Sequence, residues 1–167
     1  YFIDYQGDYR CARLVTFDAE TGVTRTLFEE TSKTYVNLSP DYIDAENMHV
    51  VLPDTNELIW WSERSAWGHL YLYDLTTGEL HHPITQGEWL VRNIVHVDVD
   101  KRELWIQTTG RVEGRNPYYR DICRVNIDTG ELTPVISSDH EYCVERLNYF
   151  PNINRPQQSC GIAPDAD

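Results

Sequence analysis

Alternating apolar and polar residues recur along this chain in short runs that lead into similar turns. Each of three such runs enters an acidic turn that closes with Thr-Gly. The three segments are residues 13–22, 69–78 and 121–130. A period of two predicts strands with one buried face. Because glycine readily adopts the positive φ of tight hairpin turns, each Thr-Gly predicts a turn into a second strand. The second strands are expected over residues 23–28, 79–84 and 131–136.

A further pair of strands is expected before the second and the third hairpin. Residues 48–52 and 57–62 flank the turn 53–56, and residues 89–97 and 103–108 flank the turn 98–102. Four short strands that repeat about every 50 residues are typical of a β-propeller blade. No run longer than about ten residues has a clean helical period, so few helices are expected.

The predicted fold class is all-β, a partial β-propeller with about two full four-stranded blades and parts of two others. The propeller segment is placed over residues 1–150. Its blades are expected at about 12–29 (partial), 33–86, 88–137 and 142–150 (partial). Residues 151–167 contain three prolines and are expected to form an irregular tail. Closed propellers have about four to eight blades, so the chain is expected to be a piece of a larger one.

Composition excludes several classes of protein. The 167 residues are 41% hydrophobic, which is enough to form a core. Lys and Arg number 14 against 27 Asp and Glu, and the net charge of −13 argues against binding to nucleic acid or to an anionic membrane surface. No apolar run approaches the roughly 20 residues that cross a bilayer.

The four cysteines are too few and too scattered for a disulfide scaffold. No C-x-x-C pair is present, which argues against a zinc ribbon, and no metal or cofactor is expected. Cys143 and Cys160 fit either a disulfide across a loop or two free thiols. The compartment stays open, with the cytoplasm slightly favoured over the periplasm or secretion.

The central segment, Trp60-Trp-Ser-Glu-Arg-Ser-Ala-Trp-Gly-His-Leu-Tyr-Leu-Tyr73, resembles a motif of one enzyme family. The propeller domains of dipeptidyl peptidase IV-type enzymes, in the prolyl oligopeptidase superfamily, carry a similar W-x-S-E-R-x-G-[WF]-x-H-L-Y-x-Y. Residues 24–27, 35–38, 84–89 and 116–125 also match, and the resemblance covers about 12–140. Ala66 stands where glycine is usual, and Asp121 where histidine is frequent.

The resemblance implies a propeller that precedes an α/β-hydrolase domain and encloses a cavity with it. The propeller would gate the entry of peptide substrates, and the hydrolase would remove N-terminal dipeptides with Pro or Ala second. The expected partners are peptide substrates, the hydrolase domain and a second copy in a homodimer. One alternative is a free-standing binding module that self-assembles to close a ring. Another is a different propeller enzyme or sugar-binding lineage, marked by a pocket with paired carboxylates.

No catalytic residue is expected on this chain. A serine hydrolase of this superfamily needs a nucleophile elbow, G-x-S-x-G, and none occurs. The nearest match, residues 157–161, lacks the first glycine, and no Asp and His follow Ser159 in the required order.

Substrate contact is predicted instead at Asn37 and Asp41, in a segment that the resemblance places near the cavity. The alternative for this segment is an ordinary strand and turn. The pair Glu29 and Glu30 would suit a substrate ammonium, but the family's glutamate pair lies on a helical insertion in an earlier blade. A solvated strand end is therefore expected for Glu29 and Glu30.

Other polar residues are expected to serve the architecture. Ser62, Glu63 and Arg64 would form a network within one blade, with the Arg64 guanidinium stacked on Trp67. His69 is expected to form hydrogen bonds within its blade. The remaining expectations are that His81 and His82 lie on opposite faces, that 98–100 is a turn and not a calcium loop, and that 111–115 is a contact surface or a mobile loop.

Overall fold

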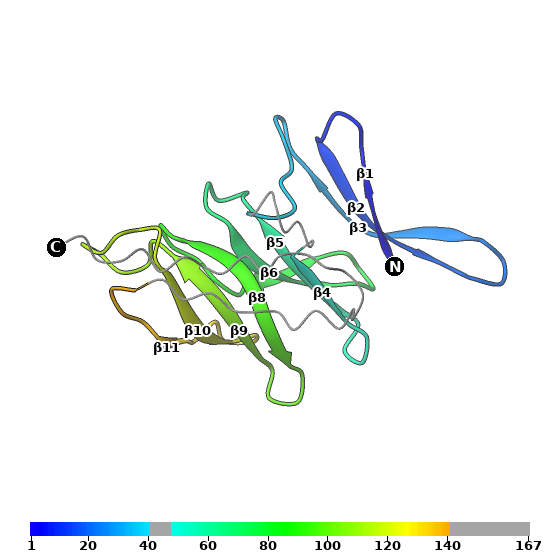
Figure 1. The fold of residues 1–167 in the computed structure, drawn as a ribbon. Coiled ribbons are helices and arrows are strands. Elements are labelled where there is room, and N and C mark those ends of the chain that lie inside the picture. The colour runs from blue at the N-terminus through cyan, green and yellow to red at the C-terminus, as the bar shows by residue number, and fades with distance from the viewer. Residues whose placement is uncertain (41–47, 141–167) are drawn as a thin grey trace, which may run out of the picture.

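The computed structural model describes residues 1–40 and 48–140, and all regular structure in them is β-strand (Figure 1). The strands are β1 (Phe2–Tyr5), β2 (Cys11–Phe17), β3 (Thr24–Thr31), β4 (His49–Leu52), β5 (Glu57–Ser62), β6 (His69–Asp74), β7 (Leu80–Pro83), β8 (Leu90–Asp98), β9 (Glu103–Thr109), β10 (Arg120–Asn126) and β11 (Leu132–Ile136). They form three antiparallel sheets, ordered β1-β2-β3, β4-β5-β6-β7 and β8-β9-β10-β11. This arrangement confirms the all-β, partial β-propeller prediction. None of the described residues belongs to a helix that could cross a membrane.

The second and third sheets contain the eight strands that the sequence predicts. The first sheet differs, because it also contains β1, which the partial blade at 12–29 left out. β1 pairs antiparallel with β2, so that Phe2 lies opposite Val15. Four residues are too few for a clear alternation, which explains the omission. The expected strand at 142–150, the tail at 151–167, Cys143 and Cys160 lie outside the described residues.

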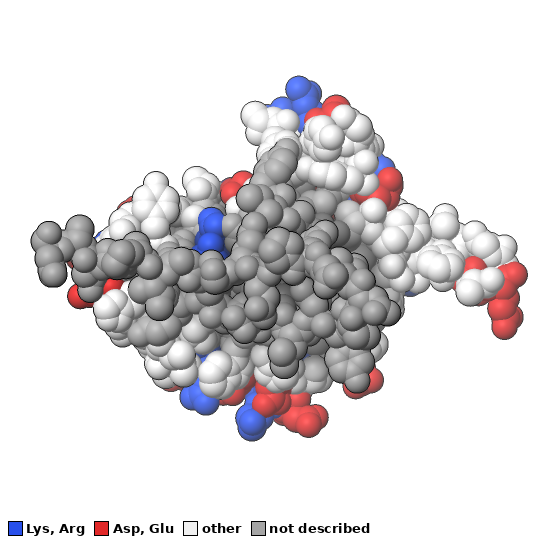
Figure 2. Space-filling model, in the orientation of Figure 1, with Lys and Arg blue, Asp and Glu red and all other residues white. Residues whose placement is uncertain are grey.

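The Thr-Gly turns share one geometry. Gly22, Gly78 and Gly130 have φ values of +70°, +75° and +70°, as predicted. In each turn an Asp or Asn side chain accepts hydrogen bonds from the backbone N–H groups two and three residues ahead; the acceptors are Asp18, Asp74 and Asn126. Such side chains stabilise turns by replacing a backbone acceptor. These turns bring acidic residues to the sheet ends, as at the tip of the β2–β3 hairpin (Figure 2).

Strand register defines two edges of the stacked sheets. Leu52 pairs with Glu57, and Glu57 pairs with Asp74. The tight turns therefore lie at the same ends of the strands, and we call this end of the sheets the hairpin edge. Ser62 pairs with His69 at the opposite end of the same strands. The longer loops 6–10, 63–68 and 110–119 and the connection 32–40 therefore lie at this second edge, here called the loop edge.

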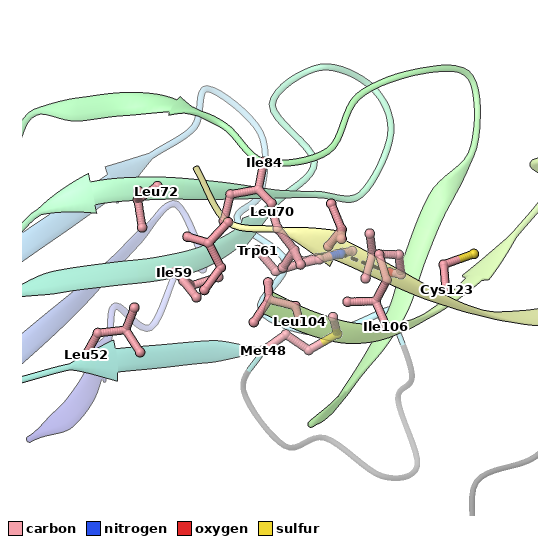
Figure 3. Close-up of a cluster of buried hydrophobic side chains, with 13 residues drawn as sticks. Met48, Leu52, Ile59, Trp61, Leu70, Leu72, Ile84, Leu104, Ile106 and Cys123 are labelled. Atoms are coloured by element: carbon pink, nitrogen blue, oxygen red, sulfur yellow. Dashed lines mark hydrogen bonds between the residues drawn. The ribbon is translucent and has the colours of Figure 1, made fainter. Parts of the chain in front are cut away.

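One hydrophobic core lies between the second and third sheets (Figure 3). Trp61 is its largest member, and the Trp61 indole N–H donates to the carbonyl of Val91 over 3.0 Å. The Val91 N–H donates to the carbonyl of Gly68 over 2.8 Å, which joins the two sheets by backbone. A Cβ at Gly68 would lie 2.2 Å from a ring carbon of Trp61, so only glycine leaves room for the indole.

A second core joins the first sheet to the second. It is aromatic: the ring centroid of Phe28 lies 4.9 Å from that of Trp60 and 4.4 Å from that of Tyr73. Tilted ring pairs at such distances add to the stabilisation from buried area. Successive blades therefore share continuous apolar contacts, as stacked propeller blades do.

Arg102 joins the second and third sheets at the hairpin edge. Its guanidinium lies 2.6 Å from a carboxylate oxygen of Glu57, in the second sheet, and 2.5 Å from one of Asp128, in the third. The hydrogen bonds from Arg102 hold the pKa of Asp128 below its usual value. Burial alone would raise the pKa of Glu57, but hydrogen bonds from Arg102 and Thr55 outweigh it, and this pKa is lowered too.

Candidate functional site

The candidate site is the connection between the first and second sheets, at the loop edge. The connection is fixed by hydrogen bonds along residues 32–40. The Ser32 hydroxyl accepts from the N–H groups of Thr34 and Tyr35, and Val36 is buried. Because its backbone is held in this way, the connection can present side chains in a defined position.

Asn37 lies half-buried in this connection, and its Oδ1 accepts from the N–H of Ser39 over 3.4 Å. The side chain therefore helps to form a local turn, while its contact with a substrate remains a prediction. Asp41, the other predicted substrate residue, lies outside the described residues.

Glu30 lies next to this connection and is not a solvated strand end, so that expectation was wrong. Its carboxylate accepts hydrogen bonds from the Trp60 indole and the Ser62 hydroxyl, and one oxygen lies 3.3 Å from the guanidinium of Arg64. Only 12% of the Glu30 side chain is exposed. We call these four residues the Glu30 cluster, and they fasten the end of β3 to the second sheet.

Glu29, by contrast, fits the expectation of an exposed residue. It pairs with Arg13 across the β2–β3 ladder at 2.5 Å. The hydrogen bond from Arg13 lowers the pKa of Glu29. Neighbouring residues on a strand point to opposite faces, which separates the two carboxylates. Glu29 and Glu30 therefore have different partners and do not form a shared ammonium site.

Arg64 also departs from its expected contacts. Its guanidinium carbon lies 4.5 Å from the ring centroid of Tyr71 and 5.5 Å from that of Tyr73, instead of stacking on Trp67. Arg64 also donates to the Tyr73 hydroxyl. Its carboxylate partner is Glu30 of the first sheet, while Glu63 is exposed. The network therefore joins two blades, where one blade was expected. Burial raises the pKa of Tyr73.

His69 has the structural role that was expected of it. Its ring nitrogens form hydrogen bonds with the Thr85 hydroxyl at 3.0 Å and the Gly87 carbonyl at 2.9 Å. The ring of Trp89 packs edge-on at 4.9 Å. Burial lowers the pKa of His69, since the charged ring would lose hydration.

The other expected decoys are also structural. His82 pairs with the Ile127 carbonyl at 2.9 Å while His81 is exposed, so the two histidines point apart. Asp98 accepts from the backbone of Lys101 and closes the β8–β9 turn. Within residues 1–40 and 48–140, no group of three or more metal-ligating side chains comes together.

The loop 110–119 is held by a buried carboxylate. Asp121 pairs with Arg115 at 2.6 Å and with Arg111 at 3.4 Å. Arg115 also donates to the Ser138 carbonyl. These contacts argue against a freely mobile loop and leave Tyr118 80% exposed on it. Asp121, where the family often has histidine, thus has a partner in this chain's own loop.

Sequence reasoning missed two features of the loop edge. The first is the Glu30 cluster, because Glu30 lies at least 30 residues before its three partners and no short motif contains both. The second is a group of three tyrosines, in which the ring of Tyr9 lies beside the rings of Tyr5 and Tyr35. The unusual tyrosine content, eleven residues, was the available signal for it.

A family model matches this chain. The model described as dipeptidyl peptidase IV (DPP IV) N-terminal region matches residues 7–151, most of the chain. The chain belongs to this family. The three sheets described above are therefore part of a DPP IV N-terminal region.

Curated relatives and solved structures are consistent with this membership. A probable dipeptidyl peptidase 4 of Emericella nidulans is 31% identical over 80 residues, which is 48% of this chain and 10% of that protein. Dipeptidyl peptidase 4 of Trichophyton equinum is 32% identical over 76 residues, 46% of this chain and 9% of that protein. The matched part thus spans about a tenth of these relatives.

Among solved structures, the fold is similar to that of Porphyromonas gingivalis dipeptidyl peptidase 4. The TM-score is 0.62 at 20% identity, over 79% of this chain and 17% of that one. A putative dipeptidyl aminopeptidase IV from Bacteroides ovatus gives a TM-score of 0.60 at 24% identity. The match covers 78% of this chain and 19% of that one. At these identities the likeness supports the fold.

Proposed function

We propose that this chain is a non-catalytic propeller segment of a dipeptidyl peptidase IV-type serine exopeptidase. The observation that carries the proposal is the match of residues 7–151 to the DPP IV N-terminal region, on blades that stack through shared cores. The sequence of this chain contains no nucleophile elbow, so hydrolysis would belong to an α/β-hydrolase domain elsewhere in the protein.

The contribution of this segment would be to gate and enclose peptide substrates. Enclosure requires a rigid wall, and the Glu30 cluster, the Trp61–Val91 contact and the Arg102 ion pairs each fasten one blade to the next. Asn37, on the connection that the Glu30 cluster supports, is the proposed substrate-facing residue. Exclusion of large substrates by such a wall confers selectivity without any catalytic group.

Two protein samples test this proposal. One is the 167-residue chain alone, and the other is the complete product of its gene. We expect the complete product to release dipeptides from a Gly-Pro chromogenic anilide and to lose this activity with a serine-directed phosphonate. We expect the chain alone to show no hydrolysis. A complete product without dipeptidyl activity, or a chain that hydrolyses the anilide alone, would contradict the proposal.

A further inference from the structure

Three tyrosines from separate segments meet at the loop edge. Tyr5 ends β1, Tyr9 lies in the turn that follows, and Tyr35 lies in the connection after β3 (Figure 1). The ring centroids of Tyr5 and Tyr9 are 5.1 Å apart at 67°, and those of Tyr9 and Tyr35 are 6.2 Å apart at 57°. We call these three residues the tyrosine surface.

Backbone and hydroxyl hydrogen bonds fix the tyrosine surface. The Tyr9 N–H donates to the Gln6 carbonyl, and the Tyr9 carbonyl accepts from the Val36 N–H, both over 2.8 Å. The Tyr5 hydroxyl donates to the Val36 carbonyl. The turn 6–10 and the connection 32–40 are therefore tied to each other on both sides of Val36. Rings held in this way lose little conformational entropy when a ligand binds.

Tyr9 has an unfavourable backbone conformation for its residue type. Its φ is +59°, in the left-handed region that a bulky side chain seldom adopts. Glycine would form the same turn at lower conformational energy. Where a strained backbone conformation is kept in a folded protein, the side chain of that residue is a candidate for a functional role. Here that side chain is an aromatic ring at the surface.

Two of the three rings of the tyrosine surface are exposed, while Tyr5 is half-buried against the second core. Tyr9 is 53% and Tyr35 47% exposed, while Tyr71 and Tyr73 of the neighbouring sheet are buried. Contiguous exposed aromatic groups on a folded protein mark interaction surfaces more often than isolated ones do. Tyrosine is also the residue that binding surfaces use for large, rigid contact area with a polar tip.

We propose that the tyrosine surface binds an extended peptide segment and holds the ring of a proline or a similar apolar side chain. The inclined ring faces offer an apolar wall, which is how aromatic surfaces recognise proline-containing extended peptides. Asn37 follows Tyr35 by two residues, on the same fixed connection. This inference rests on the proposed function, because it gives the enclosed peptide a contact in addition to the terminal dipeptide.

The test uses three variants of the complete gene product. Tyr9→Gly removes one ring and also relieves the positive φ, so folding is preserved, and Tyr35→Ala removes an exposed ring. Tyr118→Ala removes a third exposed ring from the loop 110–119 and is the matched control. The substrates are a Gly-Pro anilide and an eight-residue peptide with proline at position 2 and again at position 5.

We expect Tyr9→Gly and Tyr35→Ala each to lower kcat/KM for the eight-residue peptide about fivefold to tenfold, mainly through KM. Neither should change kcat/KM for the anilide, and Tyr118→Ala should change neither substrate. Replacing the second proline with alanine should remove the difference between wild type and variants. Three results would overturn the proposal. They are equal effects of the variants on both substrates, no effect on the peptide, and a higher wild-type kcat/KM for a peptide with lysine at position 5.

The proposed function and the tyrosine surface can fail separately. A wild-type protein without hydrolytic activity contradicts the proposed function. Binding of the same eight-residue peptide, carrying a fluorescent label, is then measured by anisotropy. Weaker binding by Tyr9→Gly but not by Tyr118→Ala supports the tyrosine surface, and equal binding by all variants overturns it.

Discussion

The carboxylate of Glu30, at the end of β3, accepts a hydrogen bond from the indole N–H of Trp60 in β5. This contact joins two sheets that are separated in sequence by the connection carrying Asn37. The same carboxylate also accepts a hydrogen bond from the Ser62 hydroxyl and forms an ion pair with Arg64. One side chain therefore holds the first blade against the second next to the proposed substrate-facing segment.

Replacing Glu30 should destabilise the protein. In Glu30→Ala, the largely buried Trp60 and Ser62 donors lose their acceptor, which costs about 1–3 kcal/mol. Chemical denaturation, followed by tryptophan fluorescence, measures the change in the free energy of unfolding. Glu29→Ala is the control: it removes the neighbouring carboxylate with its exposed ion pair and should change stability by no more than about 1 kcal/mol. Equal losses in the two variants would refute the role given to Glu30.

Gly68 should not tolerate a methyl group. A Cβ there meets the Trp61 ring at 2.2 Å, and Trp61 is fixed by its bond to Val91. Gly68→Ala should therefore lower stability by about 1–3 kcal/mol or more, the usual range for overpacking a core. Gly7→Ala adds the same methyl group where nothing lies within 4 Å, and should be close to neutral. Thermal unfolding of the pair distinguishes the clash from a general effect of losing glycine.

Acid should weaken the Arg102 ion pairs. Arg102 holds the pKa values of Glu57 and Asp128 below their ordinary 4.5 and 3.8. The unfolded chain thus takes up protons before the folded one, so this stability is present above about pH 4.5 and is lost as the pH falls through the lowered values. Thermal unfolding measured between pH 7 and pH 3 should show a shallower acid loss in Arg102→Gln than in wild type. Lys33→Gln removes an exposed cation outside these ion pairs and should retain the wild-type slope.

His69 should produce a separate pH effect at milder acidity. Burial depresses its folded pKa below 6.5, so the folded state disfavours the charged ring. Stability is fully present above the unfolded value of 6.5 and declines as the pH falls below it. His69→Gln should lower stability at pH 7.5 and flatten the slope just below pH 6.5. His81→Gln, at an exposed ring, should leave that slope unchanged, and a wild-type slope in His69→Gln would contradict the assignment.

The repeated hairpins could be predicted from sequence because their information is local. The alternation of apolar and polar residues predicted β6 and β10. The glycines at 22, 78 and 130 predicted tight turns, and they have the positive φ expected there. β1 could not be predicted in the same way, since its place depends on pairing with β2 and not on its own four residues. Local sequence patterns predict the longer strands. Whether a short segment becomes a strand depends on its pairing with a neighbouring strand.

The candidate site was less predictable for the same physical reason. The sequence pointed to Asn37 and His69 as residues of interest. In the structure, His69 forms hydrogen bonds and Asn37 helps to form a local turn. The partner of Arg64 could not be found by sequence proximity, since Glu30 lies on another blade. Side chains that meet across blades leave no motif, and only the three-dimensional arrangement brings them together.

We propose above all that this chain is one propeller segment of a larger serine exopeptidase. Reading the complete reading frame of the native gene tests it most directly. We expect the frame to continue past Asp167 into a region with G-x-S-x-G, followed by an Asp and then a His. A frame that stops at Asp167, with no such region anywhere in it, would contradict the claim and leave a propeller-like module without a hydrolase.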